Sequence, residues 1–130
     1  MGHSFLGKNI NVEMRVDSPK IVLDSNKSIF IIEGPSYPED AFEVYDCVLH
    51  WLKQNNYQFE NQLNCEFKFK VLNSSSRKMI VEILIALEMA SQKNRNIRVL
   101  WYFEKYDEDM MQAGEDLADN IDIPFDFISI

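Results

Sequence analysis

The sequence predicts one α/β domain whose mixed sheet carries its helices mainly on one face. A chain of 130 residues, 46% of them hydrophobic, suits a single domain with one continuous core. The apolar patterns run in the order β-β-α-β-α-β-α-β, which favours parallel later strands joined by right-handed crossovers and an antiparallel hairpin at one edge. In residues 63–72, apolar side chains alternate with Glu66, Lys68 and Lys70. This alternation indicates one buried and one wet face, and argues against helices on both sides.

The first half of the chain predicts a lead-in, a hairpin and a loop. Residues 1–15 show no sustained period, so we expect an irregular lead-in there and the domain over 16–130. Two short apolar runs, 21–23 and 29–32, flank a polar turn and predict a hairpin. Two prolines, a glycine and two acids in residues 34–40 then predict a loop that ends the strand and leads into a helix.

That helix and the later elements follow from alternating patterns. The helix is expected over residues 37–55, with one apolar side formed by Phe42, Tyr45, Val48, Leu49 and Leu52. After it we expect a strand over 63–72, a helix over 76–93, a strand over 97–103, an acidic helix over 108–120 and a strand over 125–130. The predicted core contains Phe30, Ile32, Phe67, Phe69, Ile80, Ile83, Leu84, Leu87, Val99 and Trp101.

The negative net charge bears on which class of molecule the protein binds. The formal net charge is −8 and the pI about 4.7, so the surface should repel nucleic acid and anionic membranes. Partners are therefore expected to be proteins. No apolar run reaches the length of a membrane span and no signal pattern opens the chain, so we expect a cytoplasmic protein. Cys47 and Cys65 fit that compartment as small buried hydrophobes rather than as a disulfide.

The junction between the strand at 63–72 and the following helix carries a polar cluster. Asn73, Ser74, Ser75 and Ser76 stand where a side-chain oxygen can accept a hydrogen bond from an unpaired N–H of the first helical turn. One cap does not need three serines. Those that do not cap would be exposed at the positive end of the helix dipole, where a phosphate is favoured. The cluster therefore predicts a helix cap and a physically plausible phosphorylation site.

The helix after this junction has more apolar surface than one core face needs. Val81, Ile85 and Met89 lie about 100–180° around the axis from Ile80. Either a neighbouring element covers this second stripe, or it is an exposed docking ridge for a partner or a second copy of the chain.

Other candidate chemistry finds little support. The acids between Glu104 and Asp122 lack the spacing of a calcium loop, so we interpret them as a solvated helix face and expect no metal. G-x-S-x-G and the glycine-rich phosphate-binding loops are absent, and no cofactor is expected. The histidines are His3, in the lead-in, and His50, which we expect to be a partly buried structural side chain.

Several segments, in their order and spacing, resemble the SiaC family of bacterial regulatory phosphoproteins over nearly the whole chain after about Ser18. They are Ser36-Tyr37-Pro38-Glu39-Asp40, Asn73-Ser74-Ser75-Ser76-Arg77-Lys78, Trp101-Tyr102, Asp107-Glu108-Asp109-Met110 with Gly114-Glu115, and Ile123-Pro124-Phe125. The layout is also similar to STAS domains and anti-sigma-factor antagonists, whose phosphorylatable serine lies at a strand-to-helix junction. Those proteins usually have Asp where Asn73 stands, and the Gly that follows is missing here.

The resemblance implies a STAS-like switch protein with no chemistry of its own. In the SiaC family, a Ser/Thr kinase with a histidine-kinase-like ATPase fold phosphorylates the first hydroxyl after the Asn, which here is Ser74. A PP2C-type phosphatase removes the phosphate. The unphosphorylated family protein can bind and activate a diguanylate cyclase, which links the switch to biofilm behaviour. The resemblance and the expected positions at strand ends suggest a contact surface formed by Tyr37, Pro38, Asn73, Ser75, Ser76 and Arg77.

An alternative of another class is a small serine-dependent hydrolase or transferase. Ser74 or Ser75 would act as nucleophile in a pocket at the carboxyl ends of the strands. Such an enzyme needs a His, Lys or carboxylate within about 3 Å of the hydroxyl and a concave site. A switch needs only an exposed serine.

Overall fold

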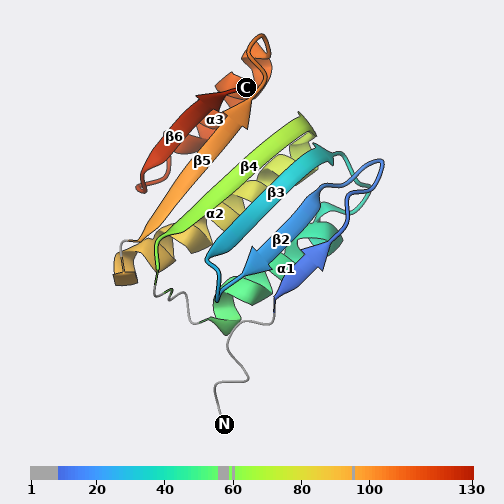
Figure 1. Ribbon diagram of the computed structural model, residues 1–130. Helices are drawn as coiled ribbons and strands as arrows, with labels where there is room; N and C mark the ends of the chain where they lie inside the picture. The colour runs from blue at the N-terminus through green and yellow to red at the C-terminus, as the bar shows by residue number, and fades with distance from the viewer. Residues whose placement is uncertain (1–8, 56–58, 60, 95) are drawn as a thin grey trace.

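The structure is a computed structural model that describes residues 9–55, 59, 61–94 and 96–130. Its elements are β1 (Ile10–Val12), β2 (Lys20–Asp24), β3 (Ile29–Ser36), α1 (Ala41–Gln54), β4 (Leu63–Leu72), α2 (Ser74–Asn94), β5 (Ile97–Phe103), α3 (Glu108–Ala118) and β6 (Phe125–Ser129) (Figure 1).

The strands form one mixed sheet in chain order, from β1 at one edge to β6 at the other. β2 pairs antiparallel with both β1 and β3, whereas the pairs β3–β4, β4–β5 and β5–β6 are parallel. α1, α2 and α3 make the three crossovers between the parallel strands. The predicted antiparallel hairpin, formed by β2 and β3, and the parallel arrangement of the later strands are confirmed, but β1 rather than the hairpin forms the edge of the sheet.

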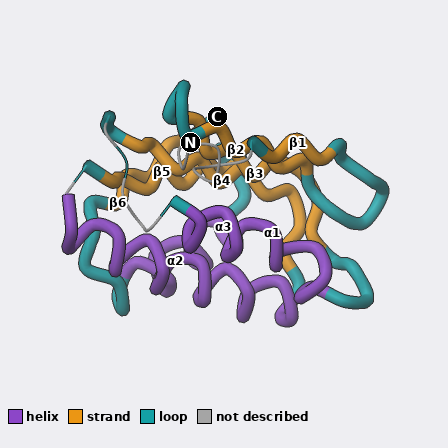
Figure 2. Tube along the Cα trace, turned by 90° about the horizontal axis from the view of Figure 1, so that it is seen from below, coloured by secondary structure: helices purple, strands orange, loops and turns teal. Residues whose placement is uncertain are grey.

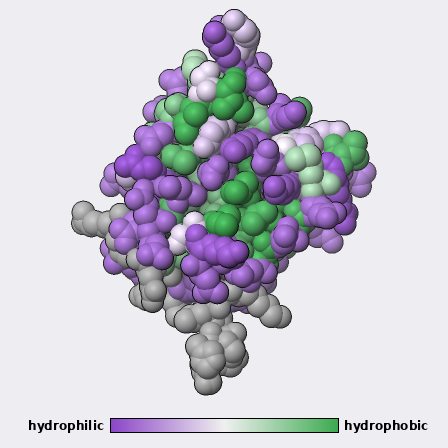
Figure 3. Space-filling model, in the orientation of Figure 1, coloured by the Kyte–Doolittle hydropathy of each residue, from purple (hydrophilic) through white to green (hydrophobic). Residues whose placement is uncertain are grey.

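All three helices lie on the same side of the sheet, as Figure 2 shows. The opposite face is open toward the viewer in Figures 1 and 3, where hydrophobic and hydrophilic side chains are interspersed. Lys68 lies on that face, 3.4 Å from a Glu66 carboxylate oxygen and 4.5 Å from the centroid of the Tyr102 ring. The alternation in β4 therefore predicted the one-sided architecture correctly.

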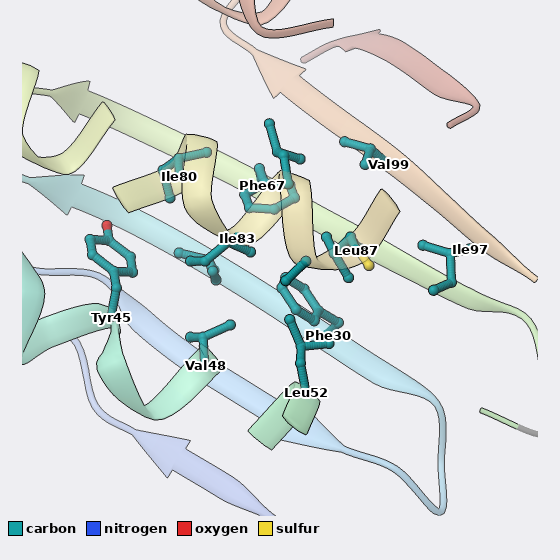
Figure 4. Close-up of a cluster of buried hydrophobic side chains, with 14 of the residues drawn as sticks. Phe30, Tyr45, Val48, Leu52, Phe67, Ile80, Ile83, Leu87, Ile97 and Val99 are labelled. Carbon is teal, nitrogen blue, oxygen red and sulfur yellow. The ribbon is translucent and has the colours of Figure 1, made fainter. Parts of the chain in front are cut away.

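The core lies between the sheet and the helix layer. All ten residues predicted for it are buried, and Figure 4 shows several of them between α1, α2 and the strands. Trp101 also fixes α3, because its Nε1 donates to the carbonyl of Met110 at 2.9 Å. A Cβ on Gly114 would lie 2.4 Å from the Trp101 ring, so α3 approaches β5 this closely only through a glycine. Cys47 and Cys65 are free thiols, partly and fully buried, as expected.

The first part of the chain corrects two expectations. The lead-in is not irregular throughout, because Ile10–Val12 pairs with β2; residues 1–8 lie outside the described ranges. The loop expected to begin at residue 34 begins later, since β3 continues to Ser36. Gly34 takes a φ of +127°, which favours glycine, and the register with β4 shifts between Gly34 and Pro35. The strand can therefore pass a glycine and a proline.

The helix starts also differ. α1 begins at Ala41 instead of residue 37, and the Asp40 carboxylate caps it by accepting from the N–H of Glu43. Phe42 is 57% exposed and does not belong to the buried side of α1, which the expected helix face got wrong. α2 begins at Ser74 rather than Ser76, a difference that places two serines inside the first turn. The remaining ends agree with the predicted ones to within one or two residues.

Candidate functional site

The candidate site begins where β3 and β4 leave the sheet side by side. Ser36 and Leu72 are register partners, and the N–H of Asn73 donates to the carbonyl of Ser36 at 3.0 Å. The Asn73 side-chain Oδ1 accepts from the N–H of Ser76 at 2.9 Å, and its carbonyl accepts from the N–H of Arg77 at 2.9 Å. Asn73 is therefore the N-cap of α2, and the predicted helix cap is confirmed.

The three serines that follow the cap have different environments. Ser74 and Ser75 are exposed, whereas Ser76 has no exposed surface. Within the described residues, neither the Ser74 nor the Ser75 hydroxyl makes a side-chain hydrogen bond to a histidine, lysine or carboxylate. Two hydroxyls are therefore free to react at the start of α2, and the third is held inside.

Ser76 takes part in a buried chain of hydroxyls that ties α2 to β3 and α1. Ser36 Oγ donates to Ser76 Oγ at 2.7 Å, and Tyr45 OH lies 2.5 Å from Ser36 Oγ. Since Ser36 has one hydroxyl proton and gives it to Ser76, Tyr45 is the donor to Ser36. Burial raises the pKa of Tyr45 to about 12, although its hydrogen bonds to the serines act in the opposite direction. The labelled Tyr45 hydroxyl is visible at the end of the core cluster in Figure 4.

The other residues predicted for the contact surface are not all accessible. Tyr37 follows β3, is 45% exposed, and its N–H donates to the carbonyl of Asp17 at 2.8 Å. Asn73 and Arg77 are partly exposed. Pro38 and Ser76 are buried, so their side chains do not form part of the folded surface.

Arg77 joins the start of α2 to α3. Its Nη2 lies 3.2 Å from Oδ2 of Asp116, whose Oδ1 accepts from Gln112 at 2.9 Å. A second contact joins α2 to the loop after α3, where Oε2 of Glu88 accepts from the N–H of Asp122 at 2.6 Å.

The second apolar stripe of α2 is exposed and is not covered by a neighbouring helix. Val81, Ile85 and Met89, which we call the ridge, are 37%, 44% and 46% exposed. Ser74 precedes Val81 by seven residues, about two helical turns, so the serine stands at the end of the same side of α2. A shallow hollow adjoins the ridge, lined by Val81, Leu84, Asp116, Leu117, Asn120 and Ile121.

The arrangement gives no support to catalysis by Ser74 or Ser75. His50 is exposed rather than partly buried, and its Nε2 lies 3.9 Å from Asp46 on α1. The hollow lies between α2 and α3 rather than at the strand ends beside the serines. In the described part of the chain, no three His, Cys, Asp or Glu side chains group as metal ligands, and no helix is long and apolar enough to cross a membrane.

Sequence reasoning missed Ser36, Tyr45 and Asp116 as parts of the site. Tyr45 was expected only as an apolar core residue, and Ser36 was expected in a loop. Ser36 would have been recognised if the strand had been predicted to continue to it, but the preceding glycine and proline indicated a loop. Nothing in the sequence pairs Arg77 with an acid 39 positions away.

Known proteins with the same fold include SiaC from Pseudomonas aeruginosa. Apo-SiaC superposes with a TM-score of 0.83 at 24% identity, covering 93% of this chain and 98% of the other. SiaC in a crystal structure of the diguanylate cyclase SiaD in complex with its activator SiaC gives a TM-score of 0.84 at 24% identity, covering 93% and 99%. These likenesses confirm the predicted single α/β domain, which has one mixed sheet of six strands and three helices.

Sequence relatives agree with the structural ones. The uncharacterized protein PA14_02130 of Pseudomonas aeruginosa strain UCBPP-PA14 is 27% identical over 108 residues, which are 83% of this chain and 86% of that protein. Residues 12–130 match the profile of the SiaC family regulatory phosphoproteins. Since that match spans the sheet from the end of β1 to β6 and includes the capped serine cluster, the chain belongs to the SiaC family.

Proposed function

We propose that this protein is a phosphorylation-controlled switch whose phosphoacceptor is Ser74. The observation that carries the proposal is the position of this residue: an exposed hydroxyl on the first residue of a capped helix, at the end of an exposed apolar ridge. Ser75 is exposed too, but it does not directly follow the Asn73 cap. Ser76 is buried and serves the hydroxyl chain instead.

A phosphate at this position acts in two ways. It adds about −1.5 to −2 charge next to free N–H groups of the first turn, which stabilises the start of α2. It also places a strongly hydrated group beside apolar surface that a partner would have to desolvate. The modification therefore leaves the fold intact while changing which partner the surface accepts.

The proposed partners follow the pattern of the family. A Ser/Thr kinase with a histidine-kinase-like ATPase fold would phosphorylate Ser74 in the cytoplasm, where ATP is available, and a PP2C-type phosphatase would reverse the reaction. The unphosphorylated form would bind a diguanylate cyclase, a proposal supported by the SiaC–SiaD complex of Pseudomonas aeruginosa. The contact surface would comprise Tyr37, Asn73, Ser75, Arg77 and the ridge.

The proposal includes no catalytic activity of the chain itself. A hydrolase or transferase would need a base at the serine and a concave site at the strand ends. Within the described residues, neither exposed serine hydroxyl is hydrogen-bonded to a histidine, lysine or carboxylate, and the hollow lies between two helices.

Phosphosite mapping tests the assignment of Ser74. With the cognate kinase and ATP, mass spectrometry should place a single phosphate on Ser74. Ser74→Ala should abolish the modification yet retain binding to the cyclase. That variant should stay folded, because the exposed hydroxyl is not the cap and its loss should change stability by no more than about 0.5 kcal/mol.

Ser75→Ala is the matched control, since it removes the neighbouring exposed hydroxyl and should leave the rate of modification unchanged. If Ser74→Ala is modified on Ser75 at an undiminished rate, the assignment is wrong. Absence of phosphate from residues 73–78 would contradict the switch itself.

A further inference from the structure

An ion pair between α2 and α3 lies beside the proposed phosphoacceptor. It joins Arg77 and Asp116 at 3.2 Å, and their side chains are 39% and 52% exposed. Exposed ion pairs of this kind are weak and exchange partners readily, because water and salt screen them. The second contact, from the Asp122 N–H to Glu88, involves no arginine and does not depend on the first.

Ser74 is close enough to compete for this arginine. It precedes Arg77 by three residues on the same helix, and side chains at that spacing are neighbours on a helix surface. A phosphate offers Arg77 a dianion and several acceptor oxygens, whereas Asp116 offers a single negative charge and already accepts from Gln112. Lys78, four residues after Ser74, adds a second cation on the same side.

We infer that phosphate on Ser74 takes Arg77 from Asp116 and so transmits the modification to the surface between α2 and α3. This inference rests on the proposed function, because it assumes that Ser74 carries the phosphate. Its consequence reaches the ridge through Asp116, which lines the hollow together with Val81 and Leu117. The freed carboxylate is an additional unpaired charge at the border of the apolar surface. Phosphorylation therefore alters the docking surface about two helical turns from the modified hydroxyl, besides adding charge at that hydroxyl.

The test uses the full chain with phosphoserine incorporated in place of Ser74 during translation, so it needs no kinase. Phosphorus NMR follows the second ionisation of the phosphate, whose pKa is ordinarily about 6. Arg77→Gln should raise that pKa by about 0.2–0.7 pH unit, the shift that an exposed ion pair produces. Asp116→Asn should lower it by a smaller amount, because Arg77 then has no competing carboxylate. Arg98→Gln is the matched control, since Arg98 pairs with Asp126 on the opposite, open face of the sheet and should have no effect.

A second readout separates this exchange from a simple charge effect. The methyl resonances of Val81 and Leu117 should move when phosphoserine replaces Ser74, and they should move much less in the Arg77→Gln background. If Arg77→Gln leaves both the phosphate pKa and the methyl response unchanged, the inference is wrong, whichever residue a kinase modifies. If the kinase ignores Ser74 while these shifts appear, the proposed function is wrong and the physical coupling stands.

Discussion

Three adjacent serines with the same chemistry acquire different roles from their positions around one helix. Each residue advances about 100° around the axis, so Ser74 and Ser75 face water while Ser76 turns toward β3 and α1. The sequence predicted the cap, and Asn73 provides it. The burial of Ser76 follows from its position four residues before Ile80, on the apolar stripe that packs on the sheet, a signal that the sequence reasoning did not use. The expected start at Ser76 differs from the observed start by two residues, which is more than half a turn.

The buried hydroxyl chain gives a testable prediction at this scale. Tyr45→Phe should lower the free energy of unfolding by about 1–3 kcal/mol, because it leaves Ser36 Oγ buried without its donor. The loss should depend on pH. The pKa of Tyr45 is raised from 10.0 to about 12 in the folded chain, so the unfolded state ionises first and stability falls as the pH rises from about 10 to 12.

Chemical denaturation at pH 8 and at several values above 10 measures both effects. The alkaline fall in stability should be smaller in Tyr45→Phe by on the order of 2–3 kcal/mol. An identical alkaline profile in the two proteins would contradict the raised pKa of Tyr45 and the burial that causes it.

At the scale of elements, periodicity predicted which faces are buried more reliably than where the elements end. The apolar stripe of α2 that packs on the sheet was predicted correctly. The exposure of the second stripe was left open by the sequence, since only the positions of α1 and α3 decide whether a neighbour covers it. β3 was predicted too short because its continuation depends on the positive φ of Gly34, which a glycine allows but does not require. Phe42 was misplaced because the buried side of α1 passes through Ala41 and Tyr45 in its first turns, which leaves Phe42 facing solvent.

Because the ridge is exposed, a substitution in it should weaken association with a partner without destabilising the fold. Ile85→Glu should change the free energy of unfolding by no more than about 0.5 kcal/mol, because Ile85 is 44% exposed. Binding to the partner should weaken at least severalfold. Gln92→Glu is the matched control, since it adds the same charge on exposed α2 surface beyond Met89. Unfolding of Ile85→Glu would assign the ridge to the core, and unchanged partner binding would remove it from the interface.

At the scale of the whole molecule, the sequence predicted the architecture because strands and helices each carry their own apolar periodicity. Alternation in β4 with charged outer positions indicated an open face, and the order of the apolar patterns predicted that the later strands lie parallel. The function needed more than this, since a fold of this kind can serve several purposes. The resemblance to the SiaC family singled out Ser74, and the structure then showed that its hydroxyl is exposed beside the ridge.

The most direct test of the account compares the affinity of the diguanylate cyclase proposed as the partner for the unmodified chain and for the chain with phosphoserine in place of Ser74. Titration calorimetry should show binding of the unmodified chain and a loss of about tenfold or more with the phosphate, equivalent to at least about 1.4 kcal/mol. Ser74→Asp should produce only part of that loss, because a carboxylate has less charge and fewer acceptor oxygens. Equal affinity of the cyclase for the unmodified and the phosphorylated chain would contradict the switch.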